Sequence, residues 1–159
     1  MCLLTNSEKL KVAKKPIKCY KLVVLDAVSV IYLSLVQRSY IPDSVIQGEK
    51  NYIAVGSGTI SKPEFRFGPG YKNWLGKKYC LNAGYIHCMS NKEDALKFCR
   101  YYIDEDADIH LFEVEVPENI EYARGVNGYS LTNNHPLNGL NVIAAKEIKF
   151  IKEIEWKKK

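Results

Sequence analysis

The chain lacks the apolar segments that direct a protein to or into a membrane. Its first ten residues hold one short apolar group, Cys2-Leu3-Leu4, before polar residues follow, which is not the pattern of a secretory signal. The longest apolar stretch, 22–36, is interrupted by an aspartate and two serines, and it is shorter than the run of about 20 apolar residues that spans a bilayer. We therefore expect a soluble, cytoplasmic protein with no membrane partner.

Paired cysteines are missing as well. The number of cysteines is odd and no CxxC pair occurs, which argues against a disulfide framework and favours reduced thiols. The spacing of Cys80 and Cys88 is not that of zinc ligands, and no second pair follows. The sequence therefore predicts no metal site. The five residues are Cys2, Cys19, Cys80, Cys88 and Cys99.

The sequence also contains no phosphate-binding loop and no internal repeat. Glycines gather in Gly56-Ser57-Gly58 and in 67–70, and both segments have the composition of turns. Neither has the GxxxxGK[ST] spacing that opens a helix under a phosphate. No bound cofactor is predicted.

The length and composition of the chain suit one folded domain. The chain has 159 residues, of which 47% are hydrophobic and 26% charged, and this is enough for one domain over 1–159 with its own core. The formal net charge is +5. Lysines gather in a polar N-terminal arm, 1–16, and in a short basic tail, 157–159, where we expect the charge to be solvated.

A nucleic-acid surface would need a basic stripe with interleaved aromatic side chains on an ordered face. The nearest match in the sequence is 72–79, Lys-Asn-Trp-Leu-Gly-Lys-Lys-Tyr. Short lysine runs of this kind mostly serve solubility. The sequence therefore disfavours nucleic acid as a partner.

Stretches rich in β-branched and aromatic residues predict a series of strands. They lie at 17–25, 28–36 (with 26–27 as the connection), 51–55, 64–67, 109–116, 120–123, 141–145 and 148–156. In the last stretch, one strand face is expected to carry Ile148, Phe150, Ile154 and Trp156. The spacing of Ile148, Ile151 and Ile154 would also suit a helix, and we favour the strand.

One helix is predicted over 91–103. Ser90 and Glu93 have the spacing of a capping box, and apolar residues then recur at helical spacing. The acidic run at 104–106 is unfavourable at a helix C-terminus and marks the end. The predicted fold class is α+β, a mostly antiparallel twisted sheet with this one principal helix packed on it.

Several segments, spread in order along the chain, carry a resemblance to a known family. They are the Met-Cys-Leu start, Cys-Tyr-Lys at 19–21, the glycine–aromatic–histidine segment 84–89 before Glu-Asp-Ala at 93–95, the strand ending in Val-Pro at 112–117, Tyr-x-x-Gly at 122–125, and 144–151. Together they resemble a family of short uncharacterised proteins from tailed phages and gut-associated bacteria. The resemblance implies a phage or mobile-element setting in the host cytoplasm, and no particular activity.

Cys2 is a candidate nucleophile. Removal of Met1 would place an α-amine beside its thiol, the pairing that N-terminal nucleophile hydrolases use. The alternative is a small buried hydrophobic residue that holds the arm to the domain. A charged arm follows Cys2, rather than a glycine-containing strand, and this favours packing.

His87 is the second catalytic candidate, because it precedes the predicted helix. Helix N-termini favour anions, so His87 would bind a phosphate or act as an acid or base near neutral pH. The alternative, which we favour, is a strand-end histidine bonded to a backbone carbonyl. The predicted ligand-binding residues are Tyr20, Lys21, Tyr85, His87, Ser90 and Asn91.

A third interpretation is an ADP-ribosyltransferase-like enzyme acting on NAD. The order of Cys19-Tyr20-Lys21, Ile86-His87-Cys88 and the 94–98 helix segment fits such folds loosely, and no catalytic residue stands out among Glu113, Glu115 and Glu121. Likeness of fold cannot establish a reaction. We therefore expect a non-enzymatic accessory protein that binds a host protein or a small anionic, nucleotide-like ligand, with counter-defence as one role. The ADP-ribosyltransferase-like enzyme and the N-terminal-cysteine hydrolase stay open as alternatives.

Overall fold

A computed structural model describes residues 2–26, 31–34, 40–63, 76–82, 84–101, 108–128 and 135–157. The elements, in chain order, are β1 (Cys2–Thr5), β2 (Lys11–Val12), β3 (Ile17–Asp26), β4 (Ile31–Ser34), β5 (Tyr40–Ile41), α1 (Asp43–Ile46), β6 (Ile53–Val55), β7 (Ile60–Ser61), β8 (Tyr79–Leu81), β9 (Ile86–Met89), α3 (Lys92–Tyr101), β10 (Ile109–Val116), β11 (Glu121–Gly128), β12 (Asn141–Ala145) and β13 (Glu147–Ile154).

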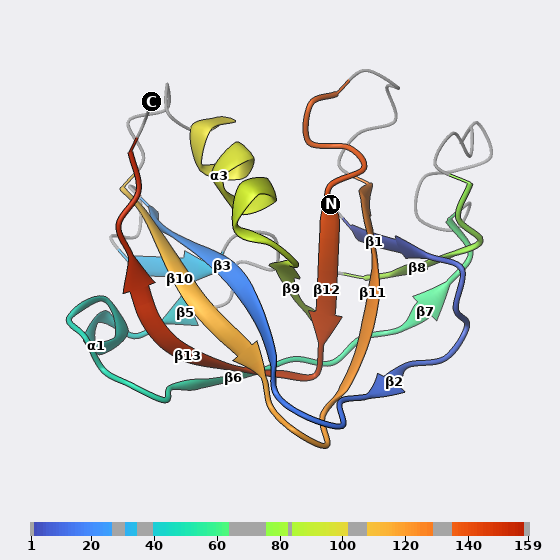
Figure 1. The fold of residues 1–159 in the computed structure, drawn as a ribbon, viewed down its shortest axis with the longest axis horizontal. Helices are drawn as coiled ribbons and strands as arrows, with labels where there is room; N and C mark the ends of the chain where they lie inside the picture. Colours follow the sequence, from blue (N-terminus) through green and yellow to red (C-terminus); the bar gives the residue numbers. More distant parts are fainter. Residues whose placement is uncertain are drawn as a thin grey trace.

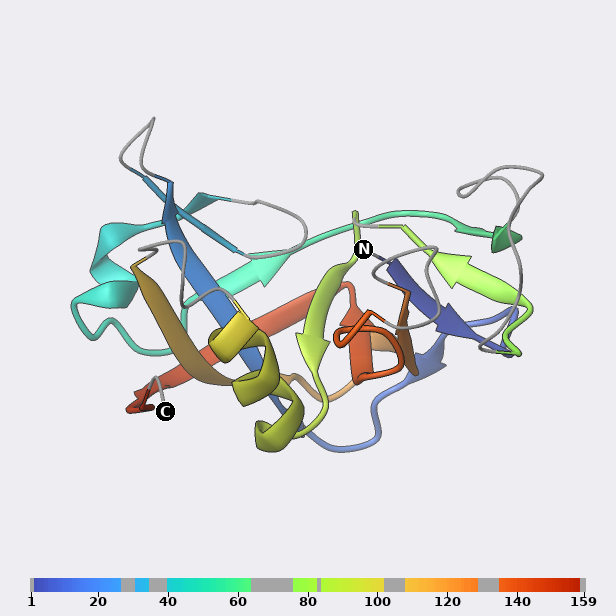
Figure 2. The same cartoon turned by 90° about the horizontal axis from the view of Figure 1, so that it is seen from above.

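The strands form one antiparallel, twisted sheet (Figures 1 and 2). Its main path runs β6-β13-β10-β3-β9-β12-β11-β1-β8-β7, with β2 added to β11, and β4 and β5 added beside β3. The two ends of this path, β6 and β7, follow each other in the chain with only residues 56–59 between them. The sheet therefore curves so that its two end strands, β6 and β7, are consecutive segments of the chain. The predicted α+β class, with one principal helix, is confirmed.

Apolar side chains cover both faces of the sheet because neighbouring residues of a strand point to opposite sides. Leu22 and Val23, for example, belong to different clusters. The helix-side core contains Leu3, Leu22, Met89, Phe98, Leu111 and Val142, among others. The opposite core contains Cys19, Val23, Cys88, Phe112, Ile143 and Phe150, among others, together with Val45 of α1.

Helix α3 packs on β3, β9 and β10 through the buried side chains of Ala95, Phe98 and Cys99. The predicted capping box is displaced by one residue. The backbone amide of Asp94 donates to Oδ1 of Asn91 at 2.8 Å, so the N-cap is Asn91 and its partner three residues later is Asp94, in place of Ser90 and Glu93. The predicted positions 102 and 103 lie outside the described residues.

The N-terminal segment differs from the expected polar arm. β1 lies between β11 and β8 in the sheet, and the side chains of Leu3 and Leu4 are buried. A group of two leucines is too short to show strand periodicity, so the sequence pattern could not reveal this strand. The arm therefore begins as an integral part of the fold.

The last strand is confirmed as β13, but its apolar residues do not share one face. Glu113 pairs with Lys152 and Val114 pairs with Phe150, so Ile151 is an extra residue in a β-bulge. A bulge shifts the alternation of side chains by one. Phe150 consequently packs in the opposite core, whereas Ile154 and Trp156 pack against the helix-side core.

β10 and β12 have the predicted bounds, and the other predicted strands are found with shifted ends, except that both ends of 28–36 lie outside the described residues. Strand 28–36 is represented by β4, 51–55 by β6 and 120–123 by the longer β11. The predicted strand 64–67, the connection at 27, residues 72–75 and the tail at 158–159 fall outside the described residues. No helix in the described ranges is long and apolar enough to cross a membrane.

Candidate functional site

His87 of β9 is enclosed in the interior of the protein. Its side chain is 1% exposed. Nδ1 lies 2.8 Å from the carbonyl oxygen of Tyr85, and Nε2 accepts a hydrogen bond from the backbone amide of Leu3 at 3.2 Å. A neutral imidazole with its proton on Nδ1 satisfies both contacts. Burial, together with the charge of Lys21, lowers the pKa of His87 to about 4 against the opposing hydrogen bond to Tyr85.

Lys21 of β3 is also buried, with 2% of its surface exposed. Its Nζ donates to the carbonyl oxygen of His87 at 2.6 Å. Burial lowers the pKa of Lys21 to about 8, although the neighbouring thiols of Cys88 and Cys19 act in the opposite direction. The lysine therefore ties β3 to β9 from within the sheet.

Cys19 and Cys88 form a buried thiol pair beside Lys21. The hydrogen bond to Cys88 and burial raise the pKa of Cys19 well above its ordinary value. Burial also acts to raise the pKa of Cys88, but the hydrogen bond from Cys19 and the charge of Lys21 outweigh it and lower that pKa. Both side chains are at most 1% exposed, so a dissolved ligand does not reach this pair in the structure.

The six predicted ligand-binding residues therefore do not gather at an open surface. Lys21, Tyr85 and His87 are buried, and Tyr20, Ser90 and Asn91 are half-buried. For His87, the structure matches the favoured alternative, a histidine bonded to a backbone carbonyl.

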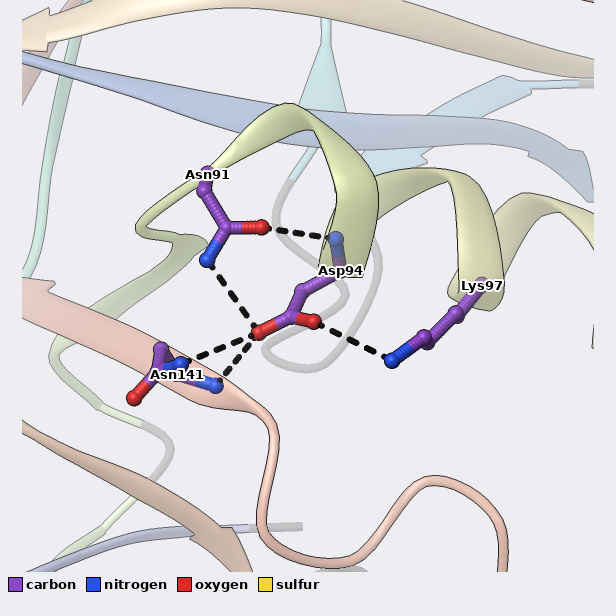
Figure 3. Close-up of polar contacts among 4 residues, drawn as sticks. All are labelled: Asn91, Asp94, Lys97 and Asn141. Atoms are coloured by element: carbon purple, nitrogen blue, oxygen red, sulfur yellow. Dashed lines mark hydrogen bonds and ion pairs between the residues drawn. The ribbon is translucent and has the colours of Figure 1, made fainter.

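The start of α3, where an anion was expected, holds a carboxylate of the protein itself (Figure 3). Asp94 is 7% exposed. Its Oδ2 accepts hydrogen bonds from the backbone amide of Asn141 at 2.8 Å and from the side-chain amides of Asn141 and Asn91, each at 3.3 Å. Oδ1 lies 3.7 Å from Nζ of Lys97. This cluster fastens α3 to the beginning of β12.

The residues on which the two enzyme interpretations depend either pair in the sheet or form ion pairs on its surface. The backbone of Cys2 pairs with that of Gly128 in β11, and its side chain is outside the described part of the structure. The distance from a carboxylate oxygen to a lysine Nζ is 2.9 Å for Glu113 and Lys18. It is 3.2 Å for Glu115 and Lys149, and 3.2 Å for Glu121 and Lys146. These glutamates therefore act as ion-pair partners on the sheet surface.

An accessible hollow of about 580 Å³ is lined by residues of β2, β11 and the start of β3 and of the segment between β2 and β3. Figure 1 shows these elements in its lower part. We call this cavity the basic hollow. Four cationic side chains surround an apolar floor, and the lining residues are Lys11, Val12, Lys14, Lys15, Ile17, Tyr122 and Arg124. The guanidinium carbon of Arg124 lies 6.0 Å from the centre of the Tyr122 ring, which is the geometry of a cation–π contact.

The cations of the basic hollow have no carboxylate partner within the described ranges. The ion pairs of the nearby strands join other residues, including Glu121 with Lys146 and Glu113 with Lys18 and Lys152. The hollow therefore concentrates positive charge that the protein does not neutralise. Such a concentration attracts anions over distances comparable to the Debye length, about 8–10 Å at ordinary salt.

The backbone around the basic hollow is held by the sheet. Val12 pairs with Glu121 and Lys11 pairs with Tyr122. The buried Ala13 donates to the carbonyl of Ile120 at 3.0 Å and accepts from the amide of Asn119 at 2.8 Å. These lysines were expected to be solvated on a terminal arm, and the structure instead fixes their backbone. β2 has only two residues, Lys11 and Val12, so no alternating pattern in the sequence could reveal it.

A second hollow, of about 810 Å³, lies between α3 and the end of β13. It has an apolar floor and charges of both signs, contributed by Lys92, Leu96, Arg100, Glu153, Ile154, Glu155, Trp156 and Lys157. Because acidic and basic side chains both line it, this hollow does not select for anions as the basic hollow does.

Comparison with models of protein families, with curated proteins and with solved structures finds no significant match.

Proposed function

We propose that this protein is a binding module for a small anionic ligand of nucleotide type, and that the ligand occupies the basic hollow. The observation that carries the proposal is the set of four cations, Lys11, Lys14, Lys15 and Arg124, around an apolar floor without a carboxylate partner in the described structure. The phage or mobile-element setting belongs to the proposal on the strength of the sequence resemblance.

The two chemical parts of a nucleotide each have a counterpart in the hollow. Phosphate oxygens accept charge-assisted hydrogen bonds from lysine and arginine, which are stronger than those between neutral groups. A base suits the apolar part of the lining, which Val12, Ile17 and the half-buried Tyr122 provide. Stacking on an aromatic side chain contributes about 1–3 kcal/mol per base.

The size of the basic hollow is consistent with this ligand. Its volume of about 580 Å³ falls inside the range of about 300–1,000 Å³ that is usual for small-molecule sites. Because the lining combines cations with apolar residues, it would orient the ligand with its phosphates at the lysines and its base against the apolar residues.

Isothermal titration calorimetry with ATP tests the proposal. The hollow variant, Lys14→Gln with Arg124→Gln, should weaken ATP binding by about tenfold or more, since 1.4 kcal/mol corresponds to a factor of ten. The matched control, Lys50→Gln with Lys92→Gln, removes the same charge from exposed lysines away from the hollow and should bind like the wild type. Equal affinities of the two variants, or no heat with millimolar ATP, would rule the proposal out.

A further inference from the structure

The tertiary structure joins two lysine clusters that are far apart in the sequence. Thr5 at the end of β1 pairs with Tyr79 at the start of β8, and the backbone amide of Lys78 donates to Oδ1 of Asn6 at 3.1 Å. Lys78 is therefore fixed beside residues 6–10, which connect β1 to β2. Figure 1 shows this connection descending on the right-hand side from the tip of β1 to β2.

Positive charge continues along this connection into the basic hollow. We define the basic strip as Lys78, Lys9 and Lys11 followed by the hollow cations Lys14, Lys15 and Arg124; all six are exposed. In residues 5–15 the sequence contains four lysines and one acidic residue, Glu8. The strip thus consists of exposed cations on chain segments that the sheet and the Lys78–Asn6 bond bring next to one another.

The strip is built on ordered backbone. The hydroxyl of Ser7 donates to the carbonyl of Lys9 at 2.7 Å, and the amide of Ser7 donates to Oγ1 of the buried Thr5 at 3.2 Å. At one end lies Tyr79 and at the other Tyr122, and both are half-buried. A basic run with an aromatic residue at each end, on a fixed face, is the arrangement that binds single-stranded nucleic acid.

We propose that the ligand of the basic hollow is one unit of a single-stranded nucleic acid, whose backbone continues along the basic strip to Lys78. This inference rests on the proposed function, because the hollow holds one nucleotide of the strand. Residues 6–12, which reach at most about 25 Å, link Lys78 to the hollow, and a strand with one phosphate per unit can follow this path, whereas a free nucleotide carries its phosphates in one place. A single strand is favoured over a duplex because only unpaired bases can stack on the two tyrosines.

Fluorescence anisotropy tests the inference with labelled 12-residue probes of thymidylate DNA and uridylate RNA. The strip variant is Lys9→Gln with Lys78→Gln, the hollow variant is Lys14→Gln with Arg124→Gln, and the control is Lys50→Gln with Lys92→Gln. We expect the strip variant to lose about tenfold in affinity for a single-stranded probe while its calorimetric affinity for ATP stays within about twofold. The hollow variant should lose affinity for both, and the control for neither.

The salt dependence supplies an independent readout. Each phosphate contact on a single strand contributes about 0.7 to the slope of log K against log salt, so the strip variant should show a slope smaller by about 1.4. Unchanged probe affinity and slope in the strip variant, with normal ATP binding, would overturn the inference and leave the proposed function standing. Failure of both ATP and the probes to bind would overturn both proposals.

Two further probes test whether the strip recognises single-stranded nucleic acid or any polyanion. A 12-base-pair DNA duplex, with about twice the charge of a single-stranded probe, and a 12-residue polyglutamate peptide, with about the same charge, offer no unpaired bases. Preferential binding of either single-stranded probe, DNA or RNA, supports the inference. Equal or tighter binding of the duplex or of polyglutamate would overturn it, because the strip would then recognise charge alone.

Discussion

Asp94 of α3 and Asn141 of β12 are joined through a single carboxylate oxygen. Oδ2 of Asp94 accepts both the backbone amide of Asn141, at 2.8 Å, and its side-chain amide, at 3.3 Å (Figure 3). The helix start is thereby attached to a strand that lies on the far side of β9 from β3. The same oxygen also receives the side-chain amide of the N-cap residue Asn91, so one side chain organises both the helix end and its docking.

Replacement of Asp94 by alanine should lower the free energy of unfolding by about 2 kcal/mol, because it leaves two donors of Asn141 without their acceptor. Urea unfolding followed by circular dichroism measures this change. Glu93→Ala is the matched control, since Glu93 is exposed one position earlier on the same helix and should change stability by less than about 0.5 kcal/mol. Equal stability of the two variants would show that the carboxylate does not hold the helix.

The displaced capping position gives a second prediction. Asn91→Ala removes the side-chain acceptor of the Asp94 amide and should cost about 1 kcal/mol, the usual value for a lost N-cap. Ser90→Ala is the comparison, because a cap at Ser90 is the sequence-based alternative. Thermal or urea unfolding of both variants decides between them, and a larger loss at Ser90 would place the cap one residue earlier.

His87 gives the protein a defined sensitivity to acid. In the folded state burial lowers its pKa to about 4 from an ordinary value of 6.5, so between these values the unfolded chain binds a proton that the folded protein does not. The free energy of unfolding should therefore fall as the pH drops from 6.5 to 4. The loss should approach about 3 kcal/mol, at about 1.4 kcal/mol per pH unit.

Comparison of wild type with His87→Gln in urea at several pH values separates this contribution from those of the carboxylates. The variant should lose stability at neutral pH but show a shallower decline between pH 6.5 and 4. Nuclear magnetic resonance of the wild type gives a direct check, in which the imidazole signal of His87 stays constant from pH 8 to 5. Titration of that signal near pH 6.5 would contradict the buried, neutral imidazole.

Local patterns identified the elements whose signals lie within a short stretch of chain. β10 and β12 have the bounds that their alternating and apolar residues predict, and α3 was recognised from helical spacing together with a capping motif. The cap itself was misplaced by one residue, because Ser90-Glu93 and Asn91-Asp94 have the same spacing and compatible chemistry. Only the contact with Asn141 distinguishes the two, since it needs the carboxylate of Asp94.

The candidate site shows a different limit of sequence reasoning. Glycine–aromatic–histidine before a helix suggested an open anion site, but β1 covers His87 from a position more than 80 residues away, as the bond from Leu3 shows. The lysines around 9–15 appeared to belong to a solvated arm. Pairing of β2 with β11 and of β1 with β8 instead fixes them beside Arg124 and Lys78.

The sequence by itself determined the α+β class, the principal helix and seven of the thirteen strands in the described residues, because propensity and periodicity act between neighbouring residues. Only the tertiary structure decided which lysines are buried and which gather at one surface. Lys21 lies inside the sheet, whereas Lys11 and Lys14 line an open hollow. Burial and the clustering of charge depend on strand order and register, which bring distant segments together and which no local pattern encodes.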